Sequence, residues 1–310
     1  MMSSSLSAWF LVGPTAVGKT AVAQALAERQ GQVILSADSM QVYRGMDIGT
    51  AKPSPIEQAR VRTLGIDLVD PDKSFSAGAW RQAALDVLRE AGPAGVVVAG
   101  GTGLYVKALV QGLVQSTPVD PARREHWEEI LAERGPNGLR EALAGLDREA
   151  LDRLQDPQNP RRLIRALERA ESGTSAPDTW GHGMETAPLV GLSRPASELN
   201  TRIEQRVKVM YAEGLVEEVR GLRARFPAWS VTAEKAIGYA ESLDVLAGRC
   251  TQGEAMTRTI ARTRRLAKRQ RTWFRHQANV CWVEAGSEPG AVIEEVLKLW
   301  RTHGPTRIAE

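Results

Sequence analysis

The chain has 310 residues, of which 43% are apolar and 25% are charged, and its 40 Lys and Arg against 37 Asp and Glu give a net charge of +3. This composition is typical of a soluble globular enzyme with a full hydrophobic core. Its two cysteines exclude a disulfide framework, and its four histidines lack metal-ligand spacing. No apolar run approaches the roughly 20 residues that span a bilayer, so we expect a cytoplasmic protein without a membrane segment.

The first third of the chain alternates predicted strands and helices. Apolar runs predict strands at 8–12, 33–38 and 95–105, and helical spacing predicts helices at 20–30 and 77–91. Continuous β-branched strands separated by helices indicate a parallel sheet covered on both faces. We therefore expect an α/β fold.

The character of the sequence changes near residue 116. From there to about 171 it is rich in Glu, Arg, Leu and Ala with helical spacing, and a Gly, Pro and Thr loop follows at 173–188. A long helix is predicted over 196–226, and the remainder of the chain is predicted to be helical and basic. We expect a P-loop-type core formed by 1–117 and 196–310, with an all-helical insertion at 118–195.

The stretch "GPTAVGKT" follows the first predicted strand and precedes the first predicted helix. It matches the phosphate-binding pattern G-x-x-x-x-G-K-[ST], whose backbone N–H groups and following helix N-terminus attract an anion. Lys19 would supply charge to the distal phosphate, and the Thr20 hydroxyl is placed to ligate Mg²⁺. The predicted phosphate-binding residues are Gly13, Pro14, Thr15, Ala16, Val17, Gly18, Lys19 and Thr20.

The position of the nearby acidic residue argues against ATP as the ligand. Kinases and ATPases with this loop usually carry a metal-binding acid at the end of a second apolar strand. The strand at 95–105 ends in glycines and a threonine, whereas Asp38 ends the strand at 33–38. Asp38 should therefore emerge beside the loop at the carboxyl edge of the sheet, where open α/β sheets bind ligands.

Five motifs in this order and at these separations resemble the bacterial tRNA dimethylallyltransferases, also called tRNA isopentenyltransferases. The resemblance runs from Leu11 to about Trp282. The motifs are "GPTAVGKT", "SADSMQVYRGMDIGTAKP", "GGTGLYVKAL", "NPRRLIRALE" and "LAKRQRTWFR".

The resemblance implies transfer of a dimethylallyl group from dimethylallyl diphosphate to the N6 amine of adenosine 37 of tRNA, immediately 3′ of the anticodon, with release of diphosphate. Asp38 matches the family's catalytic aspartate, Thr102 the threonine near the leaving oxygen, and Arg206 the diphosphate-binding arginine. Arg202, one turn before Arg206, is a weaker candidate for the same role. Mg²⁺ at Thr20 is the implied cofactor, and a monomer is expected.

Modification of that amine requires the base to leave the stack of the anticodon loop, so we expect a flipped adenosine in a channel, with the donor entering from the opposite end. The segment 258–275 is dense in cations, contains no acids and includes two aromatic residues, which favours RNA-phosphate contact over a merely solvated basic helix. The resemblance, together with this basic segment, implies contacts to the tRNA anticodon stem-loop by Ser39, Met40, Gln41, Arg124, Arg161, Arg162, Arg165, Lys235, Tyr239, Arg262, Arg265, Lys268 and Arg269. The insertion would act as a lid, moving on hinges in "STPVDP" and "GLSRP".

Three positions depart from the family pattern. Val17 replaces a small hydroxyl residue, Ala240 replaces a basic residue after "IGY", and "VRTLGIDLVD" lacks the usual histidines. Two other functions stay open at this point. A small-molecule or nucleotide kinase would explain the phosphate loop, and a non-catalytic RNA-binding protein would explain the basic helix.

Overall fold

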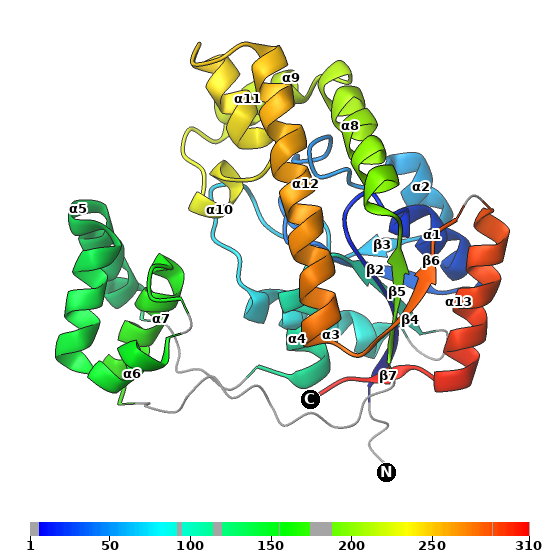
Figure 1. Ribbon diagram of the computed structural model, residues 1–310, viewed down its shortest axis with the longest axis horizontal. Coiled ribbons are helices and arrows are strands. Elements are labelled where there is room, and N and C mark those ends of the chain that lie inside the picture. The colour runs from blue at the N-terminus through cyan, green and yellow to red at the C-terminus, as the bar shows by residue number, and fades with distance from the viewer. Residues whose placement is uncertain are drawn as a thin grey trace. The chain divides into compact units, whose positions relative to one another are not determined.

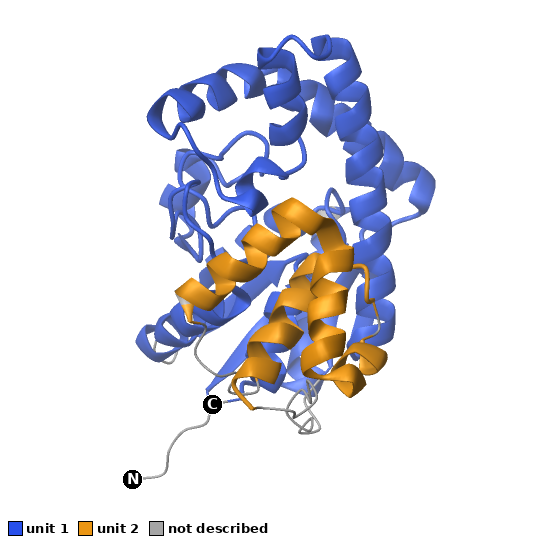
Figure 2. Ribbon diagram, turned by 90° about the vertical axis from the view of Figure 1, so that its left-hand side faces the viewer, with its two compact units in different colours: residues 1–112, 184–310 blue, residues 113–183 orange. Residues whose placement is uncertain are grey.

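The computed structural model describes residues 6–91, 95–113, 120–154, 156–173, 188–286 and 288–309. The chain divides into two compact units (Figure 2). The larger unit combines Met1–Gly112 with Met184–Glu310, and the smaller one covers Leu113–Gly183. No helix in these described ranges is both long and apolar enough to cross a membrane.

A predominantly parallel sheet forms the centre of the larger unit (Figure 1). Its strand order is β3-β2-β4-β1-β5-β6, and a short strand, β7, pairs antiparallel with β1. The phosphate-loop strand β1 is thus central, with β4 and β5 as its parallel neighbours. The strands are β1 (Ser7–Val12), β2 (Val33–Ala37), β3 (Thr63–Leu64), β4 (Val96–Gly100), β5 (Leu189–Ser193), β6 (Val280–Glu284) and β7 (Thr306–Arg307).

Helices cover both faces of this sheet. The β1-to-β2 and β3-to-β4 connections run in opposite directions across the sheet, which places their right-handed crossovers on opposite faces. α13 packs with α1, and α4 packs with α3. The helices of the larger unit are α1 (Lys19–Gln30), α2 (Pro55–Arg60), α3 (Ala77–Glu90), α4 (Gly103–Gln111), α8 (Ala196–Ala212), α9 (Leu215–Arg225), α10 (Val231–Glu234), α11 (Tyr239–Leu246), α12 (Gln252–Gln277) and α13 (Pro289–His303).

The smaller unit contains α5 (Pro121–Leu146), α6 (Arg148–Arg153) and α7 (Pro160–Glu171). Its apolar core, separate from that of the larger unit, is built around Trp127, Leu139, Leu143, Leu163 and Leu167. α5 is kinked where Gly135 adopts a φ of 65° before a proline. The described elements between residues 121 and 171 are thus all helices, whereas residues 189–193 of the expected all-helical insertion form β5.

The α/β prediction is confirmed, and three details of the sequence-based description are corrected. The helix predicted over 196–226 is two helices, because Gly214 adopts a left-handed φ of 98° between α8 and α9. The segment after 226, predicted to be helical, also contributes β6 and β7 to the sheet. Residues 191–193 of the expected hinge "GLSRP" belong to β5, so the larger unit resumes before this strand. Most of the other expected hinge, "STPVDP", lies outside the described residues.

Candidate active site

The phosphate loop connects β1 to α1 through backbone conformations that require glycine. Gly13 has a φ of 144°, and a Cβ atom built there would lie 2.6 Å from the carbonyl oxygen of Leu192 in β5. Gly18 has a φ of 111° and directly precedes the first residue of α1. The loop is thus pressed against the neighbouring strand, and its second half leads the chain into a helix N-terminus.

Two cationic side chains hold the phosphate loop. One is Lys19 of the loop motif itself, and the other is Arg202 of α8. The Lys19 ammonium donates hydrogen bonds to the carbonyl oxygens of Gly13 (2.9 Å) and Pro14 (2.8 Å). Arg202 donates to the carbonyl oxygen of Ala16 at 2.8 Å. Burial lowers the pKa of Lys19 to about 8, and the attraction of a nearby carboxylate offsets only part of that effect.

That carboxylate belongs to Asp38, which also faces Arg206. Burial lowers the pKa of Arg206, the negative charge of Asp38 opposes the shift, and the positive charge of Arg202 adds to it. Among the described residues, the Arg206 guanidinium has no hydrogen-bond partner. Lys19, Arg206 and Asp38 are therefore near enough to interact electrostatically, and the two cations together with the loop amides suit an anionic ligand.

Asp38 and Thr102 lie together because β2 and β4 are adjacent and end at the same edge of the sheet. The Thr102 amide donates to the carbonyl oxygen of Ala37 at 3.0 Å. Its hydroxyl accepts a hydrogen bond from the Ser39 amide at 3.0 Å and lies 3.3 Å from the Ser39 hydroxyl. One Asp38 carboxylate oxygen accepts from the Met40 amide at 2.9 Å, which fixes the turn after β2.

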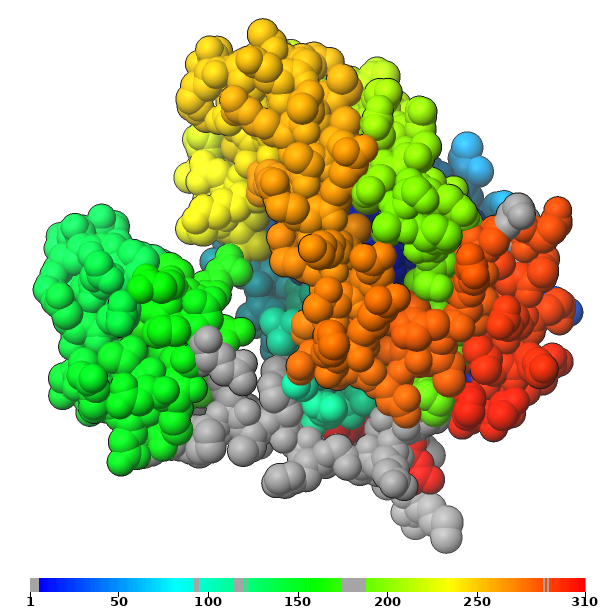
Figure 3. Space-filling model, in the orientation of Figure 1, coloured from blue at the N-terminus to red at the C-terminus, as the bar shows by residue number. Residues whose placement is uncertain are grey.

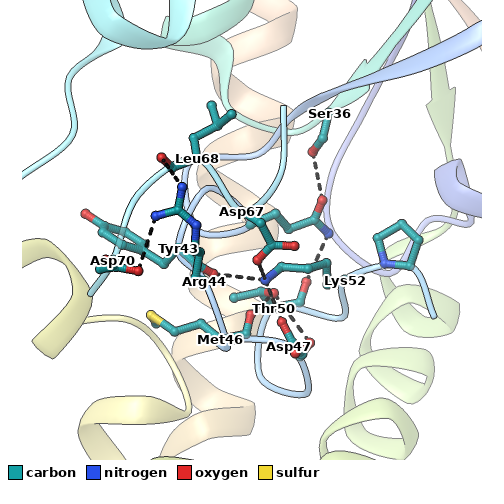
Figure 4. Close-up of polar contacts among 12 residues, drawn as sticks. Ser36, Tyr43, Arg44, Met46, Asp47, Thr50, Lys52, Asp67, Leu68 and Asp70 are labelled. Atoms are coloured by element: carbon teal, nitrogen blue, oxygen red, sulfur yellow. Dashed lines mark hydrogen bonds and ion pairs between the residues drawn. The ribbon is translucent and has the colours of Figure 1, made fainter. Parts of the chain in front are cut away.

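The segment 39–53, which we call the motif loop, is held by the buried side chain of Lys52 (Figure 4). The Lys52 ammonium donates to the Tyr43 carbonyl oxygen at 2.9 Å and forms ion pairs with Asp47 (2.5 Å) and Asp67 (2.7 Å). Since a buried ammonium is costly without partners, these three contacts fix the fold of the loop.

Gln41 and Tyr239, both predicted to contact tRNA, make hydrogen bonds within the protein. The Gln41 amide accepts from the Ser36 hydroxyl at 2.7 Å and donates to the carbonyl oxygens of Thr50 and Ala51 at 3.3 and 3.2 Å. Tyr239 is fully buried, and its hydroxyl donates to the Glu218 carboxylate and accepts from the Gly49 amide. Its ring packs against the motif loop at Gly49.

α12 packs directly on the turn after β4, and glycines permit that approach. A Cβ atom built at Gly101 would lie 2.4 Å from the Gln270 side chain, and one at Gly103 would lie 2.2 Å from the Trp273 indole. No role was predicted for Gln270 from the sequence. The motif "LAKRQRTWFR" contained the signal, since a glutamine and a tryptophan three residues apart lie on the same side of a helix.

A family model described as IPP transferase matches residues 41–277 of this chain. The chain belongs to the IPP transferase family. It is 42% identical to a tRNA dimethylallyltransferase of Corynebacterium jeikeium over 284 residues, covering 89% of this chain and 91% of that one. It is 44% identical over 283 residues to the tRNA dimethylallyltransferase of Desulfosudis oleivorans, with coverages of 88% and 90%.

The crystal structure of the tRNA isopentenylpyrophosphate transferase of Bacillus halodurans superimposes with a TM-score of 0.66 at 35% identity, covering 95% of this chain and 99% of that one. A eukaryotic dimethylallyltransferase described as acting on tRNA has a TM-score of 0.72 at 20% identity, a likeness that concerns the fold alone. The resemblance inferred from the five motifs is therefore confirmed at the level of the family.

In this IPP transferase, the cations of α12 fall into two groups. Some are paired with acids, as Arg262 is with the buried Glu241 and Arg264 is with Glu204. The second group has no ion pair with the described part of the chain. On the exposed part of the helix, which Figure 3 shows in orange along one face of the larger unit, this group comprises Arg265, Lys268, Arg269 and Arg275.

Three of the four arginines expected to bind tRNA from the smaller unit take part in interactions within the protein. Arg124 forms a two-point ion pair with the buried Glu168, at 2.8 and 3.2 Å, and Arg165 reaches the same carboxylate at 3.1 Å. Arg161 is exposed and has an interaction of its own. Arg162 is exposed and forms no ion pair with a described residue. Arg124 of α5 and Arg165 of α7 thus share one buried carboxylate, and the Arg124 ion pair joins the two helices.

A cavity of about 390 Å³ lies beside the site, between α8 and the motif loop. Its lining includes two cations and three carboxylates, from Lys52, Arg206, Asp47, Asp67 and Glu213. Ile48, Ala51, Val209 and Met210 contribute apolar atoms. The cavity is therefore of mixed charge and partly apolar, and Arg206 connects it to the phosphate loop's charged group.

The donor set fits a metal that is bound mainly through a ligand's phosphates. Thr20 is exposed at the start of α1, where its hydroxyl is available, and Asp38 supplies a carboxylate at the neighbouring strand end. No group of three or more His, Cys, Asp or Glu residues suited to a metal occurs among the described residues. One hydroxyl and one carboxylate match Mg²⁺, which keeps several waters and binds through substrate phosphates.

Proposed function

We propose that this protein is a tRNA dimethylallyltransferase, which transfers the dimethylallyl group of dimethylallyl diphosphate to the exocyclic N6 amine of the adenosine immediately 3′ of the tRNA anticodon. The observation that carries the proposal is the grouping of Lys19 and Arg206 around Asp38 at a phosphate loop. The names of relatives at about 40% identity support the same reaction.

The phosphate loop and α8 would bind the donor's diphosphate. The loop amides, Lys19 and Arg206 supply positive charge where the leaving pyrophosphate accumulates negative charge, which stabilises the breaking of the allylic C–O bond. Arg202 would act mainly by holding the loop carbonyl of Ala16. Val209 and Met210, which line the cavity with Arg206, would contact the hydrocarbon part of the donor.

Asp38 would receive the acceptor amine. In the reaction the N6–C bond forms as the C–O bond breaks, and the amine proton passes to the Asp38 carboxylate. Thr102, whose hydroxyl accepts a hydrogen bond from the Ser39 amide, would orient the leaving oxygen. Adenine N6 is a weak nucleophile, so holding it in line with the allylic carbon contributes as much as proton removal does.

Mg²⁺ would be held by Thr20 and the donor's phosphates, and it would neutralise charge on the leaving pyrophosphate. The exposed, unpaired cations of α12, together with Arg162 and Lys235, would contact phosphates of the anticodon stem-loop. Ser39 and Met40, beside Asp38, would contact the flipped base. We further propose that the protein acts as a monomer in the cytoplasm.

The test uses labelled dimethylallyl diphosphate, unmodified tRNA with adenosine 3′ of the anticodon, and Mg²⁺. We expect label on N6 of that adenosine in digested nucleosides, no ATP hydrolysis, and loss of turnover with nearly unchanged tRNA affinity in Asp38→Ala. Consumption of ATP without transfer would favour a kinase. Binding of tRNA without any turnover would favour a non-catalytic RNA-binding protein.

A further inference from the structure

The Gln270 side chain connects the two loops of the candidate site. Its carbonyl oxygen accepts a 2.8 Å hydrogen bond from the backbone amide of Thr15 in the phosphate loop. Its amide nitrogen donates at 3.1 Å to the carbonyl oxygen of Gly101, directly before Thr102. One side chain thus spans the gap between the segment after β1 and the segment after β4.

We propose that Gln270 is a positioning residue that fixes the phosphate loop relative to the Thr102 turn, so that the donor's diphosphate and its leaving oxygen are aligned. The proposal rests on the function proposed above. It concerns a residue that would not touch the reacting atoms. Its action is to set the separation of the two backbone segments that would.

The chemistry of the two contacts favours glutamine over other residues. The Thr15 contact requires an acceptor and the Gly101 contact requires a donor, and a side-chain amide offers both in one plane. A glutamate would keep the acceptor but lose the donor, and it would add negative charge beside an anion site. An asparagine would be one carbon too short to keep both contacts.

The packing around Gln270 supports the same conclusion. A Cβ atom at Gly101 would lie 2.4 Å from the Gln270 amide nitrogen, so the turn has room for this side chain only because residue 101 is glycine. Three residues later in the helix, Trp273 packs on Gly103 in the same way. α12 therefore packs on the turn after β4 in a defined position. Gln270 makes the polar contact there, and Trp273 makes the apolar one.

The experiment compares Gln270→Ala and Gln270→Glu with the wild-type protein and with Gln277→Ala, a control at an exposed glutamine of the same helix. Pyrophosphate affinity is measured by calorimetry with Mg²⁺, and donor KM, kcat and tRNA affinity are measured on the full chain. We expect about tenfold weaker pyrophosphate binding and donor kcat/KM in Gln270→Ala, with unchanged tRNA affinity. The loss in Gln270→Glu should be larger, about a hundredfold, because of the added charge.

A double-mutant cycle with Gly101→Ala tests the contact itself. Gly101→Ala should displace Gln270 and reproduce its loss, and it should add little in the Gln270→Ala background. Wild-type affinity for pyrophosphate in a folded Gln270→Ala protein would overturn the proposal, as would equal losses in tRNA and pyrophosphate binding. Should Gln270→Ala fail to fold, Gln270→Glu and the Gly101→Ala single variant decide the question. Pyrophosphate binding needs neither tRNA nor prenyl transfer, so failure of the proposed reaction would be seen separately.

Discussion

The hydroxyl of Tyr239 lies 2.6 Å from the Glu218 carboxylate and donates a hydrogen bond to it. The same hydroxyl accepts from the Gly49 amide at 3.2 Å, and Glu218 accepts from the amides of Asp47 (3.2 Å) and Ile48 (2.9 Å). A Cβ atom at Gly49 would lie 2.4 Å from the Tyr239 ring. α9 and α11 thus hold the backbone of the motif loop through the half-buried Glu218 and the buried Tyr239.

Removing the Tyr239 hydroxyl should loosen the motif loop. Tyr239→Phe leaves the Gly49 amide without its acceptor and removes the donor to one of the two Glu218 carboxylate oxygens, so we expect the free energy of unfolding to fall by about 1–3 kcal/mol. Activity should fall more than tRNA affinity does. Urea denaturation and steady-state kinetics check both. Tyr211→Phe, which loses the 2.9 Å contact to Thr259 between α8 and α12, is the matched control and should destabilise the protein without the selective loss of activity.

Donor binding should weaken as the pH rises through about 8. Lys19 has a pKa lowered to about 8 by burial, so above that pH the free protein loses the charge that attracts the diphosphate. The affinity for pyrophosphate, measured from pH 6.5 to 9.5, should fall by up to tenfold per unit above pH 8. Lys19→Met should bind weakly at every pH, and an unchanged slope in that variant would assign the titration to another group.

The same shift affects stability with a defined sign. The unfolded chain keeps the Lys19 proton up to the ordinary pKa of 10.5, whereas the folded protein releases it near 8. Between these values the unfolded state binds more protons, so this group makes the free energy of unfolding rise with pH. Lys19→Met should remove that increment from denaturation curves at pH 8 and 10.

Adding a methyl group at Gly103 should disrupt the packing of α12 on the turn after β4. Its Cβ atom would lie 2.2 Å from the Trp273 indole, so either the helix or the turn must move. We expect Gly103→Ala to cost about 1–3 kcal/mol of stability and most of the activity. Gly253→Ala, at a position of α12 with open space around it, is the control and should be neutral or slightly stabilising in the same thermal denaturation assay.

The two groups of α12 cations should behave differently toward tRNA. Lys268→Ala and Arg269→Ala should each weaken tRNA binding and reduce the slope of log affinity against log salt by about one. Arg258→Ala, which removes a partner of Asp244, should leave the slope nearly unchanged. Filter binding at several salt concentrations measures the slopes. Equal slopes for all three variants would contradict phosphate contact by the unpaired group.

Arginines of the smaller unit should separate into structural and RNA-binding roles. Arg124→Ala leaves the buried Glu168 with Arg165 as its remaining partner, so we expect faster hydrogen exchange in α7. Arg162→Ala should leave exchange unchanged and weaken tRNA binding. Exchange mass spectrometry and filter binding, applied to both variants, test this division.

The sequence was sufficient to predict the parts of the fold that depend on local patterns. Apolar runs predicted strands where β1, β2 and β4 form, and the glycine pattern predicted the phosphate loop. It could not reveal that Gly214 breaks the helix over 196–226, because a single glycine is tolerated in many helices. β6 was missed because strand pairing with β5 depends on residues far away in the chain.

The sequence predicted which residues belong to the candidate site better than it predicted which partners their side chains contact. Motif residues such as Gln41 and Tyr239 were expected to face the substrate, yet their polar atoms bind the protein's own backbone. A sequence pattern reports that a polar side chain is required and does not report which partner it serves. Gln270 was overlooked for the same reason, since its two partners come from loops far away in the chain.

The topology around β1 also bears on how the protein folds. Leu11 pairs with Ala99 in β4 on one side and with Val190 in β5 on the other. The smaller, helical unit lies between β4 and β5 in the chain. Contacts inside that unit join residues close in sequence. Pairing of β5 with β1, by contrast, closes a long loop of chain, which costs more conformational entropy and is slower. We therefore expect the helical unit to acquire its structure early during refolding, and the phosphate loop to become competent for binding only at the last step.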